Sequence, residues 1–373
     1  MENKLINLER WLNYDELLIL PGPSMVEPNE VDLKSKVTRN IPVNLPIVSS
    51  PMDYVTESRM AIEMAKLGAI GAIHRNMSLE REVEEVKKVK KVYGEKGATV
   101  DDYGRLRVIA SIGPFDEERA IALDKAGVDA IIIDCAHGHN LRVVKFASKI
   151  KRLISCDLIV GNIATPNAVE DYVDIADGFR VGLGGGSICI TRIVTGVGAP
   201  QASAVHFVSL EAEKKGIPVI ADGGIASSGD IVKALALGAD SVMLGYLIAG
   251  TDETPGKIID GTAIGLKGLF KPYRGMGSKT VISKTDRYGK SVKRAAEGVE
   301  ALIKYRGSVR DALMEIVDGV KQGLGYIGAR NIDELKSKAK FVRVTSMGRI
   351  EDEKLVRISV EDWRRLVEES GGG

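Results

Sequence analysis

Cysteine is scarce in this sequence, long hydrophobic runs are missing, and positive and negative charges nearly balance. The three cysteines, Cys135, Cys156 and Cys189, are an odd number without paired spacing, which excludes a disulfide framework and a zinc motif. No stretch approaches the roughly 20 apolar residues of a membrane span, and the N-terminal residues contain no apolar run of signal-peptide length. The net charge of +1 provides no basic surface for nucleic acid. We therefore expect a cytoplasmic protein that binds neither membranes nor nucleic acid.

The sequence does contain a repeated alternation of short apolar runs and amphipathic segments. Eight apolar, β-rich runs are predicted as strands: 45–50, 69–74, 107–112, 130–135, 158–163, 178–183, 218–223 and 241–246. Helical patterns are predicted between them at 57–66, 79–93, 115–126, 140–150, 166–175, 204–215 and 228–237. Apolar strands that alternate with helices indicate a parallel sheet buried on both faces. Eight such units favour a single closed (β/α)8 barrel over an open sheet. The turn after the first strand also lacks the G-x-G-x-x-G pattern of an open dinucleotide-binding sheet.

The alternation stops after the eighth predicted strand. Residues 250–305 contain many Gly, Lys and Arg residues and little periodicity, which predicts a long mobile flap. Helical periodicity returns at 309–322, which we interpret as the last barrel helix, and residues 345–373 are expected to form a frayed C-terminal tail. Residues 1–373 are thus predicted to form one catalytic barrel domain.

Polar residues and glycines follow the predicted strands at the end where barrels place their chemistry. The most informative segment is GLGGGSICIT at 182–191, in which glycines allow the backbone to approach a ligand closely. Cys189 in this loop is predicted to be a reactive thiol, activated by N–H dipoles or cations. The alternative is a small buried hydrophobic side chain, which is common for cysteine. Cys156 lies near the start of a strand and is predicted to be structural.

Glycines also follow the seventh and eighth strands, where barrels commonly bind phosphate with backbone N–H groups. They belong to Asp222-Gly223-Gly224 and to Leu244-Gly245. A phosphate would repel Asp222, so this carboxylate is predicted to bind ribose hydroxyls. The alternative is that the glycines only form tight turns. Arg287 and Tyr288, taken without other information, are typical of a solvated loop.

Several motifs resemble those of one family. They are VGLGGGSICITR, TGVGAPQASAV, ADGGIASSGDIVKALALGAD, YRGMGS and DRY followed by EGVE, together with VSSPMDYVTE, IHRNMS and GLGYIGARNIDEL. Over nearly its whole length the chain resembles the IMP dehydrogenase and GMP reductase family. The resemblance implies oxidation of IMP to XMP with NAD⁺ in guanine nucleotide biosynthesis, a potassium ion and a homotetramer.

The resemblance also implies a mechanism. Cys189 would attack C2 of the purine, hydride would pass to NAD⁺, and a covalent thioimidate would remain. Arg287 and Tyr288 would then enter the vacated nicotinamide site, where Arg287 would activate water to hydrolyse the adduct. Thr191 and Glu297 would form a second proton relay.

Three sets of binding residues follow from the same resemblance. The substrate set is Ser50, Met52, Asn162, Ser187, Asp222, Gly223, Gly224, Gly245, Tyr246, Tyr273, Gly275, Met276, Gly277 and Glu297. The cofactor set is Asp134, Cys135, Ala136, His137, Asn162, Gly182 and Gly184. The potassium set consists of the backbone carbonyls of Gly184, Gly186 and Cys189.

Two features favour the dehydrogenase branch, namely YRGMGS and the Arg287-Tyr288 pair, which reductases lack. The main alternative is a GMP reductase, which deaminates GMP to IMP with NADPH. A nucleotide-binding barrel without catalysis and a flavin barrel are further alternatives.

The chain also departs from the family. Residues 77–104 leave room only for a helix and a short loop, so the regulatory CBS modules that the family often inserts there are expected to be absent. Tyr246 stands where a small residue usually lies beside the phosphate, and Gly289 replaces the usual aromatic residue after Tyr288.

Overall fold

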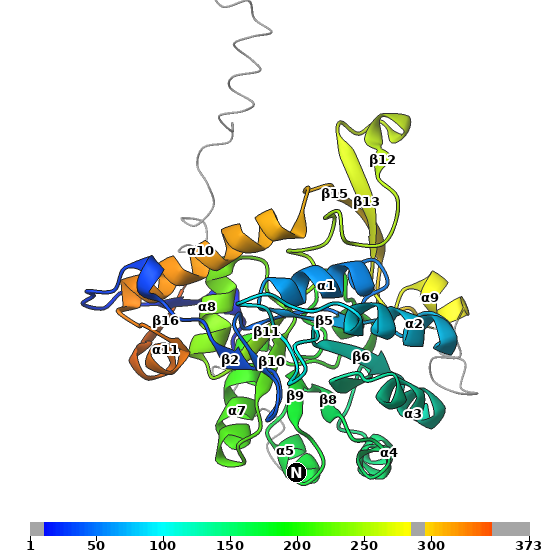
Figure 1. Ribbon diagram of the computed structural model, residues 1–373. Helices are drawn as coiled ribbons and strands as arrows, with labels where there is room; N and C mark the ends of the chain where they lie inside the picture. Colours follow the sequence, from blue (N-terminus) through cyan, green and yellow to red (C-terminus); the bar gives the residue numbers. More distant parts are fainter. Residues whose placement is uncertain (1–10, 285–294, 345–373) are drawn as a thin grey trace, which may run out of the picture.

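Eight short parallel strands close into a barrel at the centre of the molecule (Figure 1). The computed structural model describes residues 11–284 and 295–344. The barrel strands are β4 (Ile47–Ser49), β5 (Ile70–Ile73), β6 (Val108–Ile112), β7 (Ala130–Asp134), β8 (Asp157–Ile163), β9 (Gly178–Val181), β10 (Val219–Asp222) and β11 (Ser241–Leu244). Each strand pairs with the next along the chain, and β11 pairs with β4 to close the ring. The predicted (β/α)8 barrel is confirmed.

Helices surround the barrel on its outside. They are α1 (Ser58–Lys66), α2 (Leu79–Lys90), α3 (Glu117–Lys125), α4 (Leu141–Lys151), α5 (Asn167–Tyr172), α7 (Gln201–Lys214), α8 (Ser228–Ala236) and α10 (Val309–Ile327). Polar caps start several of them; the Ser308 hydroxyl, for example, accepts the Asp311 N–H at the start of α10. This helix continues five residues beyond the predicted end at 322 and stops where Gly328 adopts a left-handed conformation.

Two apolar cores result from this arrangement. The larger core lies between the barrel strands and the helices around them. The smaller core fills the barrel interior with side chains such as Ile70, Ile132 and Ile220. The hairpin of β2 (Ser35–Lys36) and β3 (Pro42–Val43) contributes to this inner core and closes one end of the barrel.

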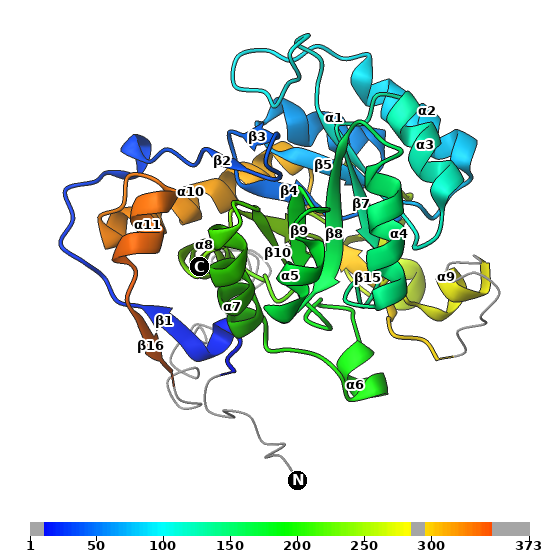
Figure 2. The same cartoon turned by 90° about the horizontal axis from the view of Figure 1, so that it is seen from below.

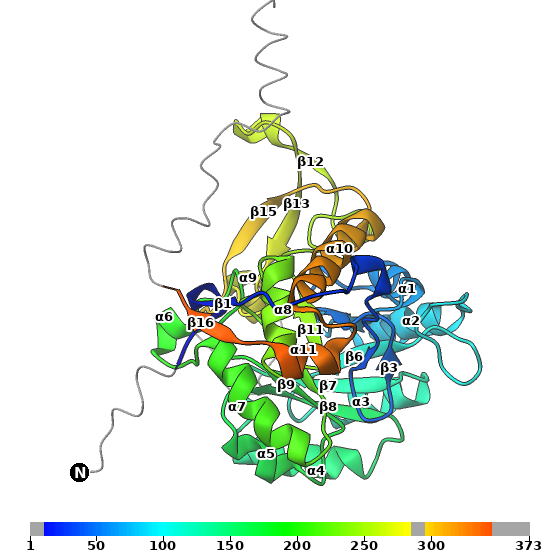
Figure 3. The ribbon, with the colours of Figure 1, turned by 90° about the vertical axis from the view of Figure 1, so that its left-hand side faces the viewer.

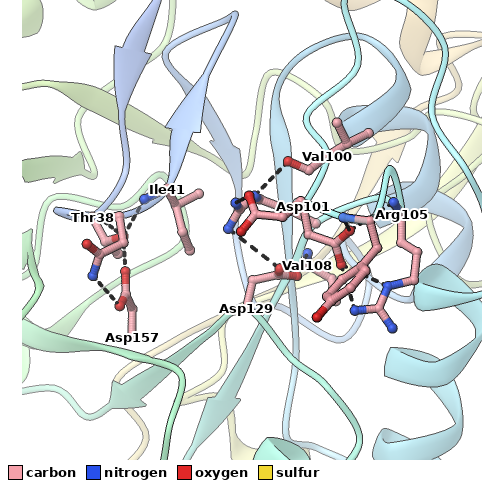
Figure 4. A network of polar contacts seen from close by, with 12 residues as sticks. Thr38, Ile41, Val100, Asp101, Arg105, Val108, Asp129 and Asp157 are labelled. Carbon is pink, nitrogen blue, oxygen red and sulfur yellow. Dashed lines mark hydrogen bonds and ion pairs between the residues drawn. The ribbon is translucent and has the colours of Figure 1, made fainter.

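A polar network lies at the closed end of the barrel, beside that hairpin (Figure 4). The buried ammonium of Lys90 contacts the carboxylates of Asp101 and Asp129 at 2.9 Å each. Asp129 also accepts the Val108 N–H at 2.8 Å, and the Asp157 carboxylate accepts the hydroxyl proton of Thr38. These ionic groups face one another rather than a ligand, so this end of the barrel serves stability.

Segments outside the barrel form additional strands and helices. The terminal strands β1 (Leu17–Ile19) and β16 (Phe341–Arg343) pair in antiparallel fashion, which Figure 2 shows at one edge of the molecule. The remaining elements are η2 (Tyr14–Glu16), η3 (Pro28–Glu30), α6 (Thr191–Thr195), η4 (Gly261–Ile264), α9 (Lys279–Lys284) and α11 (Ile332–Lys338). None of the helices within the described ranges has the length and apolar character that crossing a lipid bilayer requires.

The segment at 250–305, which is predicted to be a long mobile flap, contains regular structure. It contains an antiparallel sheet of β12 (Ile259–Asp260), β13 (Leu269–Arg274) and β15 (Glu300–Lys304), which extends away from the barrel in Figures 1 and 3. Pairing between β13 and β15, about 30 residues apart, is a non-local contact that periodicity does not reveal. Arg287, Tyr288 and Gly289, and the predicted tail at 345–373, lie outside the described residues.

Candidate active site

A cavity of about 320 Å³ opens at the carboxyl ends of the barrel strands. The residues that line it come from the loops after β4, β7, β8, β9, β10 and β11 and from the strand β13 with its following turn. All but one of the described residues in the predicted catalytic and binding sets line this one cavity. The exception is His137, which is exposed at the end of β7 outside the lining.

The glycine-rich loop after β9 carries Cys189 into the cavity. The Cys189 N–H donates to the Gly186 carbonyl at 3.1 Å, which makes a tight turn. Cys189 also forms an antiparallel bridge with Gly298, so the segment just before β15 holds the Cys189 loop from the other side. The guanidinium of Arg192 lies close enough to Cys189 for their charges to interact. Cys189 is therefore a partly exposed thiol in a cavity with a cation nearby.

The thiol of Cys189 is the first member of a chain of polar groups. Its Sγ lies 3.2 Å from the Thr191 hydroxyl, which donates to the Glu297 carboxylate at 3.0 Å. Thr191 begins α6, and Glu297 lies just before β15. Two segments that are distant in sequence therefore supply this chain of polar groups. The Ile190 N–H donates to the Glu297 carbonyl at 2.9 Å and keeps these segments together. A proton can move between Cys189 and Glu297 through one hydroxyl.

The other two cysteines differ from Cys189. Burial raises the pKa of Cys135 to about 12, and the Asp134 charge acts in the same direction. Burial also raises the pKa of Cys156, and a hydrogen bond with Asp124 is the second cause of this rise. Both thiols therefore stay protonated at neutral pH. This agrees with the structural role predicted for Cys156, and it leaves Cys135 a lining residue without nucleophilic character.

Hydroxyl groups and glycines gather on the side of the cavity near β11. The Ser187 and Tyr273 hydroxyls lie 3.2 Å apart. A Cβ atom at Gly245 would lie 3.1 Å from the Tyr273 hydroxyl, so a larger residue there would have to push this hydroxyl aside by a few tenths of an ångström. The Gly224 N–H, a predicted phosphate donor, already donates to the Gly185 carbonyl at 2.7 Å.

A buried arginine links two acidic members of the predicted sets. Arg180 on β9 donates to the Asp222 carboxylate at 2.9 Å and to the Asp134 carboxylate at 2.9 Å. Asn162 donates to the same Asp222 oxygen at 2.8 Å, and Arg75 contacts Asp134 at 3.3 Å. One guanidinium thus holds both the carboxylate predicted to bind ribose hydroxyls, Asp222, and a carboxylate of the predicted cofactor set, Asp134.

The predicted carbonyl ligands for a cation all belong to the Cys189 loop. The Gly186 carbonyl accepts one hydrogen bond, whereas those of Gly184 and Cys189 accept none from the residues that the structure describes. A carbonyl oxygen has two lone pairs, so each of the three retains capacity for a hard cation. Along the described chain, no group of three or more His, Cys, Asp or Glu side chains is arranged to hold a metal ion.

Sequence reasoning missed several lining residues. Arg180, Gly185, Ile188 and Ile225 line the cavity but were not predicted. Arg180 had a detectable signal, because a charged residue inside an apolar parallel strand needs an internal partner. The aliphatic residues carried no signal that would separate them from the core.

Comparisons with known proteins are informative over nearly all of the chain. A family model described as "IMP dehydrogenase / GMP reductase domain" matches residues 11–354. The chain belongs to this family. Among curated members, the inosine-5′-monophosphate dehydrogenase of Cryptosporidium parvum is 41% identical over 382 residues, covering 92% of this chain and 94% of the relative. That of Thermoplasma acidophilum is 38% identical over 462 residues, covering 92% and 94%.

A solved structure of the same family has the same architecture. It is a GMP reductase from Trypanosoma brucei in complex with guanosine 5′-monophosphate, with a TM-score of 0.85 and 30% identity. The structural match covers 92% of the chain described here and 97% of the reductase chain. Within this family, the chain described here has only residues 91–107 between α2 and β6, including the bridges Tyr93 to Arg105 and Val100 to Leu106.

Proposed function

We propose that the cavity oxidises IMP to XMP with NAD⁺ through a covalent adduct on Cys189, in the synthesis of guanine nucleotides. The observation that carries the proposal is the chain from Cys189 through Thr191 to Glu297 inside a cavity that the predicted substrate residues line. The names of the curated relatives, at 35–41% identity, agree with this activity.

The first step is attack of the Cys189 sulfur on C2 of the purine. A carbon–sulfur bond forms, and the thiol proton leaves through the Thr191 hydroxyl toward Glu297. Bound NAD⁺ supplies the acceptor for the hydride that C2 then loses. Asp134, Gly182 and Gly184 would hold this cofactor, since the Asp134 carboxylate lines the cavity and carboxylate oxygens accept ribose hydroxyls.

The second step is hydrolysis of the thioimidate. Water adds to C2, the carbon–sulfur bond breaks, and Cys189 recovers its proton. Arg287 and Tyr288 are proposed to activate this water after the cofactor leaves, with Thr191 and Glu297 as a second route for the proton. A potassium ion at the carbonyls of Gly184, Gly186 and Cys189 would hold the loop in the shape that aims Cys189 at C2.

Two parallel assays of cofactor absorbance, one with IMP and NAD⁺ and one with GMP and NADPH, test this function. IMP with NAD⁺ should increase the absorbance of reduced cofactor, and Cys189→Ala should abolish the increase. Arg287→Ala should still give one burst of reduced cofactor per site and then stop, because the adduct accumulates. Arg192→Lys keeps a cation beside Cys189 and serves as the control for the loop. A Cys189→Ala variant that turns over at the wild-type rate would refute covalent catalysis.

The second candidate is a GMP reductase, which the similarity to the Trypanosoma brucei structure favours. It would use the same Cys189, Thr191 and Glu297 to release ammonia from GMP. If the protein is a GMP reductase, a mixture with GMP and NADPH should lose absorbance of reduced cofactor. If it is the proposed dehydrogenase, the absorbance of this mixture should stay constant.

We further propose a cytoplasmic homotetramer formed by barrel domains without CBS modules. Light scattering should give four times the mass of one chain. Purine nucleotides other than the substrate should not change the rate through a separate regulatory site.

A further inference from the structure

An aromatic ring that lines the cavity is paired with a cation that lies behind the lining. Tyr246 follows Gly245 at the end of β11 and lines the cavity. The guanidinium carbon of Arg306, between β15 and α10, lies 4.9 Å from the centre of the Tyr246 ring. Arg306 also donates from Nη1 to the Leu247 carbonyl at 2.9 Å and from its backbone to the Gly250 carbonyl at 3.0 Å. Three contacts with the segment after β11 therefore fix its position.

The rest of the cavity lacks positive charge for a phosphate. Arg180 is the only cationic side chain in the described lining, and Asp134 and Asp222 both pair with it. A phosphate monoester carries about −1.5 to −2 charges at neutral pH. The lining that the structure describes leaves this charge without a cationic partner.

The other donors on the phosphate side are neutral, and they include the backbone N–H groups of Gly245 and Tyr246, which donate to no residue in the described chain. Ser187 and Tyr273 supply hydroxyls, while the Gly224 N–H already donates to the Gly185 carbonyl. By the sequence resemblance, Tyr246 stands where the family usually has a small residue beside the phosphate. The resemblance therefore implies that one phosphate contact of the family differs in this chain.

Arg306 has donors to spare. A guanidinium has five N–H donors, and Arg306 uses one on Leu247 and the others on no residue in the described chain. Its field reaches the phosphate side. Burial raises the pKa of the Tyr273 hydroxyl, and the hydrogen bond with Ser187 and the charge of Arg306 both oppose that rise.

We propose that Arg306, held over the ring of Tyr246, binds the 5′-phosphate of the nucleotide substrate in place of the usual small residue. This inference rests on the proposed nucleotide site and adds a specificity-determining residue to it. Contact with the ring leaves the outer N–H groups of the guanidinium directed away from the aromatic face, where they can donate to phosphate oxygens. The pair thus distinguishes a nucleoside monophosphate from a nucleoside.

Calorimetric binding of IMP and of inosine, without cofactor, tests the proposal. Arg306→Met should raise the dissociation constant for IMP about 10- to 100-fold, as expected for loss of charge-assisted hydrogen bonds. The inosine affinity should stay the same. Arg306→Lys should recover part of the loss. The matched control is Arg310→Met on α10, whose exposed guanidinium pairs with Glu63 at 3.9 Å and which should bind IMP like the wild type.

Equal IMP affinity in the wild type and in Arg306→Met overturns the inference. An equal loss for IMP and inosine also overturns it, because it marks a structural role. If Arg306→Met fails to fold, Arg306→Lys and Tyr246→Leu are compared for the same difference between nucleotide and nucleoside.

The inference and the proposed function can fail separately. Binding of IMP without formation of reduced cofactor contradicts the function but leaves the Arg306 comparison valid. If the wild type binds neither IMP nor GMP more tightly than the matching nucleoside, both proposals are wrong.

Discussion

Arg180 is a buried charge inside a barrel strand, and its surroundings explain why it is tolerated. Burial opposes its ionisation, but Asp222 and Asp134 more than offset that cost and raise its pKa. The same guanidinium orients both carboxylates toward the cavity. Without it, two negative groups would face each other across the end of the barrel in a region of low dielectric.

Replacement of Arg180 should therefore affect stability and binding together. Arg180→Met should lower the free energy of unfolding by about 3–5 kcal/mol, the cost of leaving buried charges unpaired, and raise KM for both IMP and NAD⁺. Urea denaturation and steady-state kinetics measure the two effects. The control Arg142→Met removes an exposed arginine from the start of α4 and should change stability by less than about 0.5 kcal/mol. A loss below 1 kcal/mol in Arg180→Met, with KM unchanged, would contradict this account.

Among the elements, the loop after β9 depends most on glycine. Gly182 has a φ of +146°, and a Cβ atom there would collide with the carbonyl oxygen of Asp222 on β10. Gln201 at the start of α7 donates to the Val181 carbonyl at 2.9 Å and to the Asp222 carbonyl at 3.0 Å. The helix thus holds the ends of β9 and β10 at the separation from which the Cys189 loop starts.

Gly182→Ala should push these strand ends apart. We expect a loss of about 1–3 kcal/mol in stability, typical of overpacking, and a lower kcat because Cys189 moves away from Thr191. The control is Gly216→Ala, where φ is +63° and nothing lies within 4 Å of the added Cβ atom. That change should cost about 1–2 kcal/mol for the backbone conformation alone and leave kcat unaltered. Equal kcat in both variants would argue against a special role for Gly182.

Considered as a whole, the molecule has an ionic network at one end of the barrel and the cavity at the other. The network around Lys90 and Asp101 lies at the amino ends of the strands, and the cavity lies at the carboxyl ends. Burial opposes ionisation of Asp101, but hydrogen bonds from Lys90 and from the Arg105 backbone lower its pKa to about 2. A carboxylate with a depressed pKa stabilises the fold above its unfolded pKa of about 3.9, and this contribution is lost as the pH falls through about 2.

Asp101→Asn should lower the free energy of unfolding by about 2 kcal/mol at neutral pH, the scale of hydrogen bonds to a charged group. The difference from the wild type should shrink as the pH falls from about 4 toward about 2, while KM and kcat at neutral pH stay the same. Urea denaturation of both proteins at several pH values measures this difference in the free energy of unfolding. Asp102→Asn is the neighbouring control, since its side chain is 98% exposed. A difference that persists unchanged at low pH would exclude ionisation of Asp101 as its cause.

The predicted barrel strands all correspond to observed ones, because apolar runs and amphipathic helices are local patterns. Residues at the carboxyl ends of parallel strands must meet at one edge, so the order of elements also brought Ser50, Asn162 and Asp222 to one cavity. The sheet that contains β13 escaped prediction, because its pairing partners are distant in sequence. The roles assigned to the site residues stay predictions, including those of Arg287 and Tyr288.

The sequence by itself determined the barrel and the loop that carries Cys189, since both depend on local periodicity and on the conformational freedom of glycine. Only the tertiary structure decided which groups face one another: Thr191 with Glu297, Arg180 with two carboxylates, and Arg306 with Tyr246. These contacts join residues that are between 42 and 106 positions apart. Their distances follow from how strands and loops pack in space, which no local pattern records.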